Sequence, residues 1–579
     1  MSGCRISVLL AIVAMCACSG CGLPASMAEW REYRAVEALI ARGADLDAPD
    51  DDIDGGLRLH RAASDGHAAV VQLLIENQAN VDARDGYGYT ALHRAAMAGN
   101  NRIAEMLLDA GAYTQPHIRT TKAHTEPPHR MKITPLHLAA WNGNLKTARL
   151  LLSRGAKADA TARHNVTPLH FAAGGGNLEM VELLIAHGAD PLAKTPNNTS
   201  AMHFAASAGT LVVDYRCEVA DPPFVLGGGA PDVVMLTAHC GDEHGEIVKL
   251  LLAKGAKVDQ AGAFGYTPLH FAAGSFCVSA TDALIKAGAE VTAEVPYVKG
   301  VIPGWPKRTN ALHLAACHLG GFDASRARQT VDALIRAGAP VNAADGQGAT
   351  ALHNASYGAR SDAIKLLLAA GANVNARSTL FESRDVGLPE RLRSSIDPPG
   401  LSNKPRERKM TPLLAAMLYS SRWHASEGDF VGGHQRLSDS VRILLKNGAD
   451  VKAALSNGET ALHIASARYN GAALVKMLID AGADVNAKTN GGVTPLHYAV
   501  MANVMTWVSD SSRSSSAQTE SLRMLLANGA DPNAKTVKTE YSFPETALDW
   551  AREKKRAEAV KLLEPVTGMY KMFPATRPR

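Results

Sequence analysis

The chain has 579 residues, more than a single compact core accommodates, so we expect several domains or an array of repeats. Its 60 Lys and Arg residues nearly balance its 56 Asp and Glu residues, and the resulting formal net charge of +4 argues against a general nucleic-acid-binding protein. Aromatic residues make up only 5% of the chain, and the abundance of Gly and short aliphatic side chains favours many thin helical layers over one thick core.

The first 20 residues have the pattern of a secretion signal. A single positive charge, Arg5, precedes the apolar stretch Ile6–Ala17. This stretch is too short to cross a membrane, which takes about 20 apolar residues. We therefore expect residues 1–20 to be a signal peptide.

The end of this segment, Cys18-Ser19-Gly20-Cys21, resembles the lipobox of bacterial lipoproteins. In those proteins small residues precede a Cys that is lipidated and becomes the new N-terminus. The resemblance implies that Cys21 is the lipidated residue, with Cys18 as an alternative acceptor. Cys18 stands where lipoproteins usually have an aliphatic residue, so ordinary signal cleavage is the competing interpretation.

A lipid anchor at Cys21 would leave residues 21–27 as a short tether to the membrane. The next residue is Gly22 rather than Asp, and by resemblance to Gram-negative lipoproteins this implies the outer membrane, with the protein facing the periplasm. The alternative is a soluble periplasmic or secreted protein.

After the tether the sequence repeats itself. The string TPLHLAAWNGNLKTARLLLSRGAKADA, Thr134–Ala160, is followed by TPLHFAAGGGNLEMVELLIAHGADPLA, Thr167–Ala193, and the equivalent His137 and His170 are 33 positions apart. This period and the T-P-L-H-x-A motif resemble the ankyrin repeat family. The same His position recurs at twelve places: His60, His93, His137, His170, His203, His270, His313, His353, Leu414, His463, His497 and Asp549.

The resemblance implies an all-α fold, an α-solenoid in which each unit is a helix, a turn, a second helix and a β-turn finger. We expect about 12–13 units over residues 28–564, counting a half-unit from Val36, and a disordered tail over residues 565–579. Thr-Pro suits a helix start, and a Gly such as Gly188 suits a helix end. Long insertions fall between these elements, at about 210–242, 377–409, 420–436 and 503–517.

The repeated histidines look at first like a metal or catalytic series. One His per repeat places neighbours at a helix-packing distance of roughly 8–10 Å, whereas zinc ligands lie about 2 Å from the metal. The resemblance implies that this His hydrogen-bonds within the turn and ties adjacent repeats. No phosphate loop, metalloprotease or serine-hydrolase motif is present in the sequence. We therefore expect no catalytic residue, no cofactor and no metal site.

The strongest ligand-like cluster is HCGDEHGE, His239–Glu246. Its second half matches the start of a second repeat helix, which explains His244 and Glu246 without a metal. An enzyme or metal site housed in the loop insertions is the least favoured reading.

In an oxidising compartment the remaining cysteines could pair. Cys217 and Cys240 lie in the same insertion, so we predict a disulfide between them. Cys277 and Cys317 could pair or stay free.

With no catalytic or metal site expected, the protein surface is the remaining candidate for function. In ankyrin proteins the finger tips and the exposed face of the first helix usually meet a partner, and Tyr, Trp and Arg are enriched at interface hot spots. By that resemblance the partner-binding candidates are Tyr87, Tyr89, Trp141, Asn142, Phe264, Tyr266, Tyr357, Arg360, Arg468 and Tyr469. We expect a non-enzymatic scaffold of the bacterial cell envelope that binds proteins and no nucleic acid. The alternative is a secreted effector that acts on host proteins.

Overall fold

The computed structural model describes fourteen stretches of the chain, and it divides into two compact units, Met1–Glu290 and Val291–Arg579. The described stretches are residues 24–48, 57–86, 88–116, 132–208, 240–262, 265–295, 308–317, 324–380, 408–418, 430–468, 471–501, 514–537, 545–553 and 556–572.

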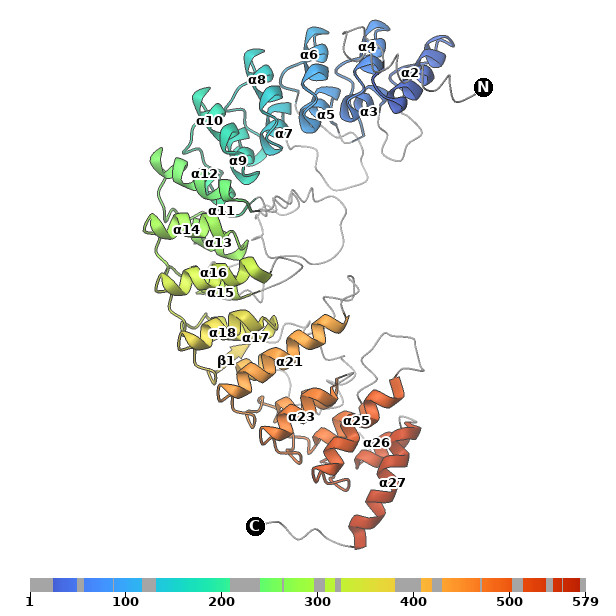
Figure 1. Ribbon diagram of the computed structural model, residues 1–579, viewed down its shortest axis with the longest axis vertical. Coiled ribbons are helices and arrows are strands. Elements are labelled where there is room, and N and C mark those ends of the chain that lie inside the picture. Colours follow the sequence, from blue (N-terminus) through green and yellow to red (C-terminus); the bar gives the residue numbers. More distant parts are fainter. Residues whose placement is uncertain are drawn as a thin grey trace, which may run out of the picture. The chain divides into compact units, whose positions relative to one another are not determined.

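In the described residues of the first unit, a single helix, α2 (Met27–Ile40), precedes a series of helix pairs (Figure 1). The pairs are α3 (Arg58–Asp65) with α4 (Ala68–Glu76), α5 (Ala91–Ala98) with α6 (Asn101–Asp109), α7 (Pro135–Trp141) with α8 (Leu145–Ser153), α9 (Pro168–Gly174) with α10 (Leu178–Ala186), α11 (Ala201–Ala206) with α12 (Asp242–Ala253), and α13 (Pro268–Gly274) with α14 (Val278–Lys286). A short 3₁₀ turn, η1, spans Arg163–Asn165.

The second unit has the same construction. Its pairs are α15 (Ala311–Ala316) with α16 (Ala324–Arg336), α17 (Ala351–Tyr357) with α18 (Ser361–Ala369), α20 (Pro412–Met417) with α21 (Phe430–Lys446), α22 (Ala461–Ser466) with α23 (Ala472–Asp480), α24 (Pro495–Met501) with α25 (Ser514–Ala527), and α26 (Ala547–Glu553) with α27 (Ala557–Met572). The described residues thus hold twelve helix pairs preceded by a lone helix, as the twelve recurring His positions and the half-unit predict.

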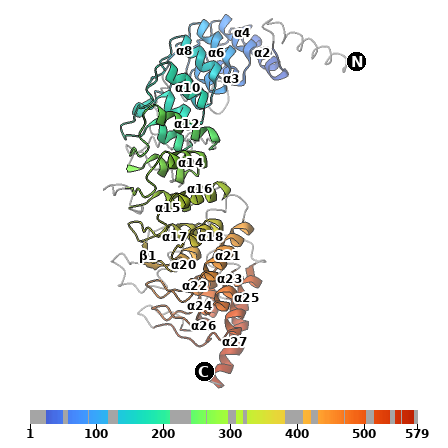
Figure 2. The ribbon, with the colours of Figure 1, turned by 60° about the vertical axis from the view of Figure 1, so that its left-hand side comes forward.

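Stacking within each unit follows one rule. First helices contact first helices, as α5 contacts α7, and second helices contact second helices, as α6 contacts α8. Figure 2 shows the same two columns in the second unit, where α20 follows α17 and α21 follows α18. Paired alanines such as Ala139 and Ala140 are fully buried and small enough for neighbouring first helices to pack closely, while Leu136 and Leu151 fill the layer between the two helices of a repeat. The all-α repeat solenoid predicted from the sequence is confirmed.

Helix ends follow the local sequence. Thr134 stands before Pro135, whose missing N–H costs nothing at the first helical position. Most second helices end at a glycine in the left-handed region, such as Gly188 with a φ of 88°, although after α4 the residue with positive φ is Gln78. A side chain at that backbone angle would be strained, which explains the repeated Gly-Ala.

Three elements differ from expectation. Some insertions lengthen the second helix instead of remaining loops: α12, α16, α21 and α25 have 12, 13, 17 and 14 residues, against 9 in α8. The strands β1 (Ser378–Leu380) and β2 (Arg408–Met410) pair antiparallel at the two ends of the 377–409 insertion.

The third difference concerns the C-terminus. Helix α27 continues through Pro565 to Met572, so a tail that is disordered from residue 565 is wrong for residues 565–572. Proline removes a single N–H donor, and the Thr567 hydroxyl donates to the carbonyl oxygens of Leu563 and Glu564 one turn earlier. Among the helices of the described residues, none has the length and apolar character needed to span a membrane.

Candidate protein-interaction site

In most repeats a histidine hydrogen-bonds to the repeat that follows. In the repeat of α7, the His137 Nδ1 accepts hydrogen bonds from the Thr134 backbone N–H at 3.2 Å and from the Thr134 hydroxyl at 2.8 Å. The opposite ring nitrogen, Nε2, donates to the carbonyl oxygen of Val166 in the following finger, at 3.2 Å. One side chain therefore caps its own helix and ties it to the neighbouring repeat.

Burial keeps these histidines neutral. Loss of hydration lowers the pKa of His93 to about 3 and that of His170 and His203 to about 4. In the second unit, burial lowers the pKa of His353, His463 and His497 to about 4. Each of these rings caps its own helix, and the rings of His93, His203, His353 and His463 also bond to the backbone of the next repeat. Their role is structural, and they do not converge on a common centre.

In the last helix pair of the described residues, Asp549 takes the place of the histidine. The Asp549 carboxylate accepts from the Thr546 hydroxyl at 2.7 Å and from the Thr546 N–H at 3.1 Å. The acid thus caps α26 as a histidine would. It cannot donate to a following repeat, and α26–α27 is the last pair.

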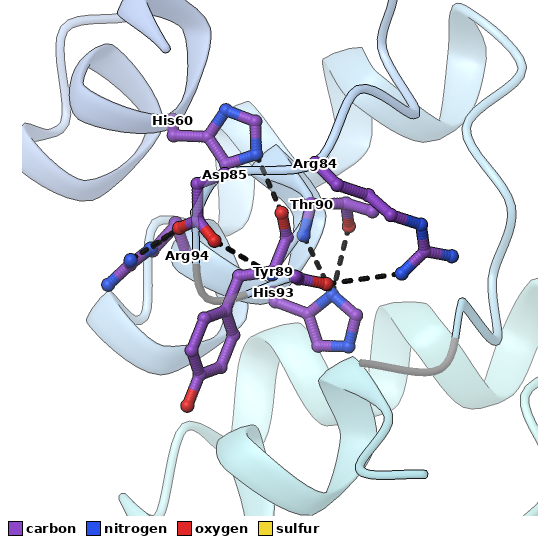
Figure 3. Close-up of polar contacts among 8 residues, drawn as sticks. His60, Arg84, Asp85, Tyr89, Thr90, His93 and Arg94 are labelled. Carbon is purple, nitrogen blue, oxygen red and sulfur yellow. Dashed lines mark hydrogen bonds and ion pairs between the residues drawn. The ribbon is translucent and has the colours of Figure 1, made fainter. Parts of the chain in front are cut away.

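The finger before α5 presents the best-defined group of polar and aromatic side chains at the predicted partner-binding positions (Figure 3). The buried carboxylate of Asp85 accepts from the Tyr89 N–H at 2.9 Å and from the Arg94 Nε at 3.0 Å. The Arg94 guanidinium lies over the half-buried Tyr89 ring, 4.7 Å from its centre. His60 donates to the Tyr89 carbonyl at 2.8 Å, which fixes the finger from the preceding repeat.

The next first helix ends in a second candidate pair. Trp141 is half-buried, with its ring edge-on to Phe171 at 6.1 Å between centres. Asn142 caps α7, is exposed, and its amide donates to the Leu138 carbonyl at 3.2 Å. Both side chains therefore combine a fixed position with accessible surface.

Three other candidates are held by the fold to different degrees. Tyr357 and Arg360 are half-buried, at the end of α17 and the start of α18. Burial raises the pKa of the Tyr357 hydroxyl. Arg468 is also half-buried, and its guanidinium donates to the Met417 carbonyl of the preceding repeat at 3.0 Å. It therefore serves as a tie between repeats.

Tyr266 does not fit the prediction of a partner-facing residue. It is only 6% exposed, and its ring packs against His270 and Phe271. Burial raises the pKa of its hydroxyl to about 12. The candidates Tyr87, Phe264 and Tyr469, the lipidation candidates Cys18 and Cys21, and Cys217 lie outside the described residues.

A second series of ties follows the start of the second helices. The residue eleven positions before the helix-ending glycine reaches back to the preceding inter-helix turn: Asn177, eleven before Gly188, donates to the Trp141 carbonyl at 2.7 Å. Asn100 and Asn144 do the same at 3.0 and 3.1 Å to the equivalent turns. Sequence reasoning missed this series, although its constant spacing from the glycine was visible.

The same position is occupied by His244 in α12 and by Cys277 in α14. His244 Nε2 donates to the Gly174 carbonyl at 3.3 Å, in place of the asparagine. Cys277 forms a disulfide with Cys240, with the two Cα atoms 5.3 Å apart. The predicted bond from Cys240 to Cys217 is therefore wrong in this structure, because a cysteine forms one disulfide and stacking brings Cys277 beside Cys240.

Comparison with known families matches ankyrin repeats (3 copies) at residues 25–119, 136–221, 298–378 and 433–536, which is more than half of the chain. The chain is 37% identical to an ankyrin repeat protein of Rickettsia bellii over 81 residues, 14% of this chain and 33% of that protein. It is 36% identical to Rabankyrin-5 of Homo sapiens over 96 residues, 17% of this chain and 8% of that protein.

A third relative is ankyrin repeat and SOCS box protein 6 of Homo sapiens, 34% identical over 140 residues, 23% of this chain and 31% of that protein. The matched stretches thus span a third or less of these relatives' own lengths. Together with the twelve stacked helix pairs of the described residues, the family match establishes that the chain belongs to the ankyrin repeat family.

Proposed function

We propose that this protein is a non-enzymatic scaffold that binds a protein partner at the bacterial cell envelope. The observation that carries the proposal is the placement of half-exposed aromatic side chains on repeats that are hydrogen-bonded to their neighbours, as His93 bonds to the Ile133 carbonyl and Asn144 to the Met97 carbonyl. Side chains that are already held in place lose little conformational entropy when a partner binds, which favours binding.

The favoured contact surface is formed by the neighbouring repeats of α5 and α7, whose first helices touch. One contributes Tyr89 and Arg94, and the other Trp141 and Asn142. We call these four residues the aromatic face. Stacked Tyr–Arg and edge-on Trp–Phe contacts hold these rings in place, and rigid aromatic anchors of this kind dominate binding energy at protein interfaces.

Site-specific photo-crosslinking tests the aromatic face. A photo-activatable residue at position 142, which is exposed in an inter-helix turn, should give one discrete adduct in cells. The matched control is position 187, which is equally exposed but lies at the end of the second helix α10. Trp141→Ala should reduce the adduct at position 142. Equal adducts at both positions, or an adduct that Trp141→Ala leaves unchanged, would contradict this location.

The envelope location rests on the N-terminal segment, where an apolar stretch is followed by Cys18-Ser19-Gly20-Cys21. We infer export and lipidation at Cys21. Labelling cells with radioactive palmitate should mark the wild-type protein and the Cys18→Ser variant, but not Cys21→Ser. An unlabelled wild-type protein in the periplasm or medium would favour the soluble, secreted alternative instead.

The absence of enzymatic activity is part of the same proposal. The histidines that would be first choice as acids or bases are buried and bonded to the backbone, as His137 bonds to Thr134 of its own repeat and to Val166 of the following finger. Burial keeps His93 and its equivalents neutral. A turnover measured with purified protein, abolished by substitution of a described side chain, would overturn this part.

A further inference from the structure

A cluster of metal-ligating side chains lies in the first unit, away from the aromatic face. The sulfur atoms of Cys240 and Cys277 and a ring nitrogen of His244 all lie within 4.8 Å of one another. Cys240 lies two residues before the start of α12, His244 lies in the first turn of α12, and Cys277 is the N-cap residue of α14. The cluster is therefore assembled by repeat stacking.

The environment of the cluster is nearly closed. His244 is 2% exposed and Cys277 is fully buried, while Cys240 is half-exposed and leaves one side open to solvent. The Ser279 hydroxyl lies 3.6 Å from the Cys240 sulfur and 3.8 Å from the Cys277 sulfur, and it donates to the Gly241 carbonyl at 2.7 Å. This hydroxyl contacts both sulfurs and fixes the turn that carries Cys240.

The identity of the side chains at this register is the second observation. Asn100, Asn144 and Asn177 show that an amide suffices to tie a second helix to the preceding turn. At the start of α12 the His244 imidazole makes this tie instead, through Nε2 to the Gly174 carbonyl. Its Nδ1 accepts from the Gly241 N–H at 3.1 Å. The asparagine position is therefore occupied by His244 in the one of these repeats where two cysteine sulfurs lie close to it.

We propose that reduction of the Cys240–Cys277 disulfide converts this corner of the first unit into a binding site for a soft divalent metal ion such as Zn²⁺. The ligands are the two thiolates and the His244 imidazole, and solvent on the Cys240 side supplies the fourth. Cys₂His sets with one open position are an established zinc arrangement. The inference does not depend on the proposed partner binding.

The chemistry balances with a dithiol as the reductant. The dithiol gives two electrons and two protons to the disulfide and is itself oxidised to a disulfide, which leaves two thiols on this chain. Metal binding then releases those two protons to solvent, while the imidazole binds in its neutral form.

The movements required are small. Ligand atoms around a tetrahedral zinc ion are roughly 3.5–3.8 Å apart, as follows from Zn–S and Zn–N bonds of about 2.3 and 2.0 Å. The His244 nitrogen, now within 4.8 Å of both sulfurs, must approach them by about 1 Å, while the two released sulfurs move apart from each other. His244 gives up one of its two backbone hydrogen bonds when it binds the metal.

Cobalt(II) titration of the full chain tests this directly. The six other cysteines, at positions 4, 16, 18, 21, 217 and 317, are replaced by serine so that only this pair can supply sulfur. After reduction by dithiothreitol and its removal under anaerobic conditions, one equivalent of Co²⁺ should produce the intense thiolate-to-cobalt absorption of a tetrahedral site. Zn²⁺ should abolish the band, and the oxidised protein should give none.

His244→Asn is the decisive variant. Asparagine reproduces the backbone tie that Asn177 makes in the neighbouring repeat, so the fold is kept, as circular dichroism would check. Loss of one ligand should weaken Co²⁺ binding at least tenfold and alter the band. The proposal is overturned if reduced protein with native His244 shows no band, or if His244→Asn binds Co²⁺ as tightly as that protein.

Discussion

Acid should destabilise both units well before their carboxylates are protonated. In the unfolded chain a histidine titrates near pH 6.5, whereas burial lowers the pKa of His463 to about 4 in the folded protein. Between these two values the unfolded state binds more protons than the folded state. The stabilisation is therefore complete above about pH 6.5 and is lost as the pH falls toward about 4.

The size of the effect follows from the two pKa values. Between about pH 7.5 and 5.5, a histidine whose pKa drops from 6.5 to about 4 on folding costs between about 1 and 2 kcal/mol of stability. Three histidines in the first unit, His93, His170 and His203, and three in the second, His353, His463 and His497, have folded pKa values of about 3 to 4. Each unit should therefore lose about 4 kcal/mol over this interval.

Urea unfolding followed by circular dichroism at the two pH values measures this loss. Long repeat arrays unfold in more than one step, so the free energy is summed over the transitions. His463→Gln removes one of the titrating groups and should reduce the pH-dependent loss by between about 1 and 2 kcal/mol. His187→Gln, at an exposed position, should leave it unchanged. Equal stability at both pH values, or the same loss in His463→Gln as in wild type, would refute the reasoning.

Further changes test the ties between repeats, with chemical unfolding as the measurement unless stated. Gly99→Ala should destabilise more than Gly111→Ala: both residues have a positive φ, which costs a side chain about 1–2 kcal/mol, but only at Gly99 would the new Cβ meet the Asn144 amide oxygen, at 2.7 Å. A larger loss in Gly111→Ala would contradict this. Cys277→Ser should cost about 4 kcal/mol in oxidised protein, from closure of the loop between residues 37 apart, and most of this difference should vanish in dithiothreitol with a chelator. A difference that persists after reduction would show that the disulfide is not its source. Asp549→Ala should loosen the last helix pair of the described residues by about 1 kcal/mol, because the Thr546 N–H at the start of α26 loses its acceptor, whereas Asp549→His should be tolerated. Hydrogen exchange in α26 and α27 distinguishes these two variants.

The repeat architecture could be predicted from the sequence because its signal is periodic. A 33-residue spacing between His137 and His170 fixes where each first helix begins, and the structure places a helix pair at each recurrence. The burial of Tyr266 was also predictable. Tyr266 precedes Thr267 just as Ile133 precedes Thr134 and Val166 precedes Thr167, and the side chains of Ile133, Val166 and Tyr266 are all 6% exposed. The tyrosine side chain suggested a contact with a partner, but at these three positions, directly before the threonine at the start of a first helix, the side chain is buried.

The Cys240–Cys277 bond shows where such reasoning fails. Proximity along the chain favoured Cys217, in the same insertion, as the partner of Cys240. In a solenoid, however, residues at equivalent positions of adjacent repeats lie beside each other regardless of the loops between them. Cys277 occupies the same register as His244, eleven residues before the closing glycine in each case, and Cys240 stands four residues before His244. The position of each residue within its repeat therefore determines which cysteines meet. The insertion hides this in the sequence, because it changes the number of residues between His203 and the second helix of its repeat.

The two recurrences that lack histidine show what that residue must do in each repeat. Asp549 caps its helix but cannot donate onward, and it stands in the last helix pair of the described residues. Leu414 lies in the interior of the second unit and can neither cap nor donate through its side chain. The Leu414 side chain is fully buried, and the Leu414 N–H donates to the Thr411 hydroxyl at 3.4 Å, so the start of α20 is still capped. Packing thus replaces one tie between repeats at Leu414, so the interface between the repeats of α20 and α22 should be among the first in that unit to open in hydrogen exchange. Leu414→His, which restores the Thr–His pair, should slow exchange there, and unchanged or faster exchange would mean that packing alone already holds this interface.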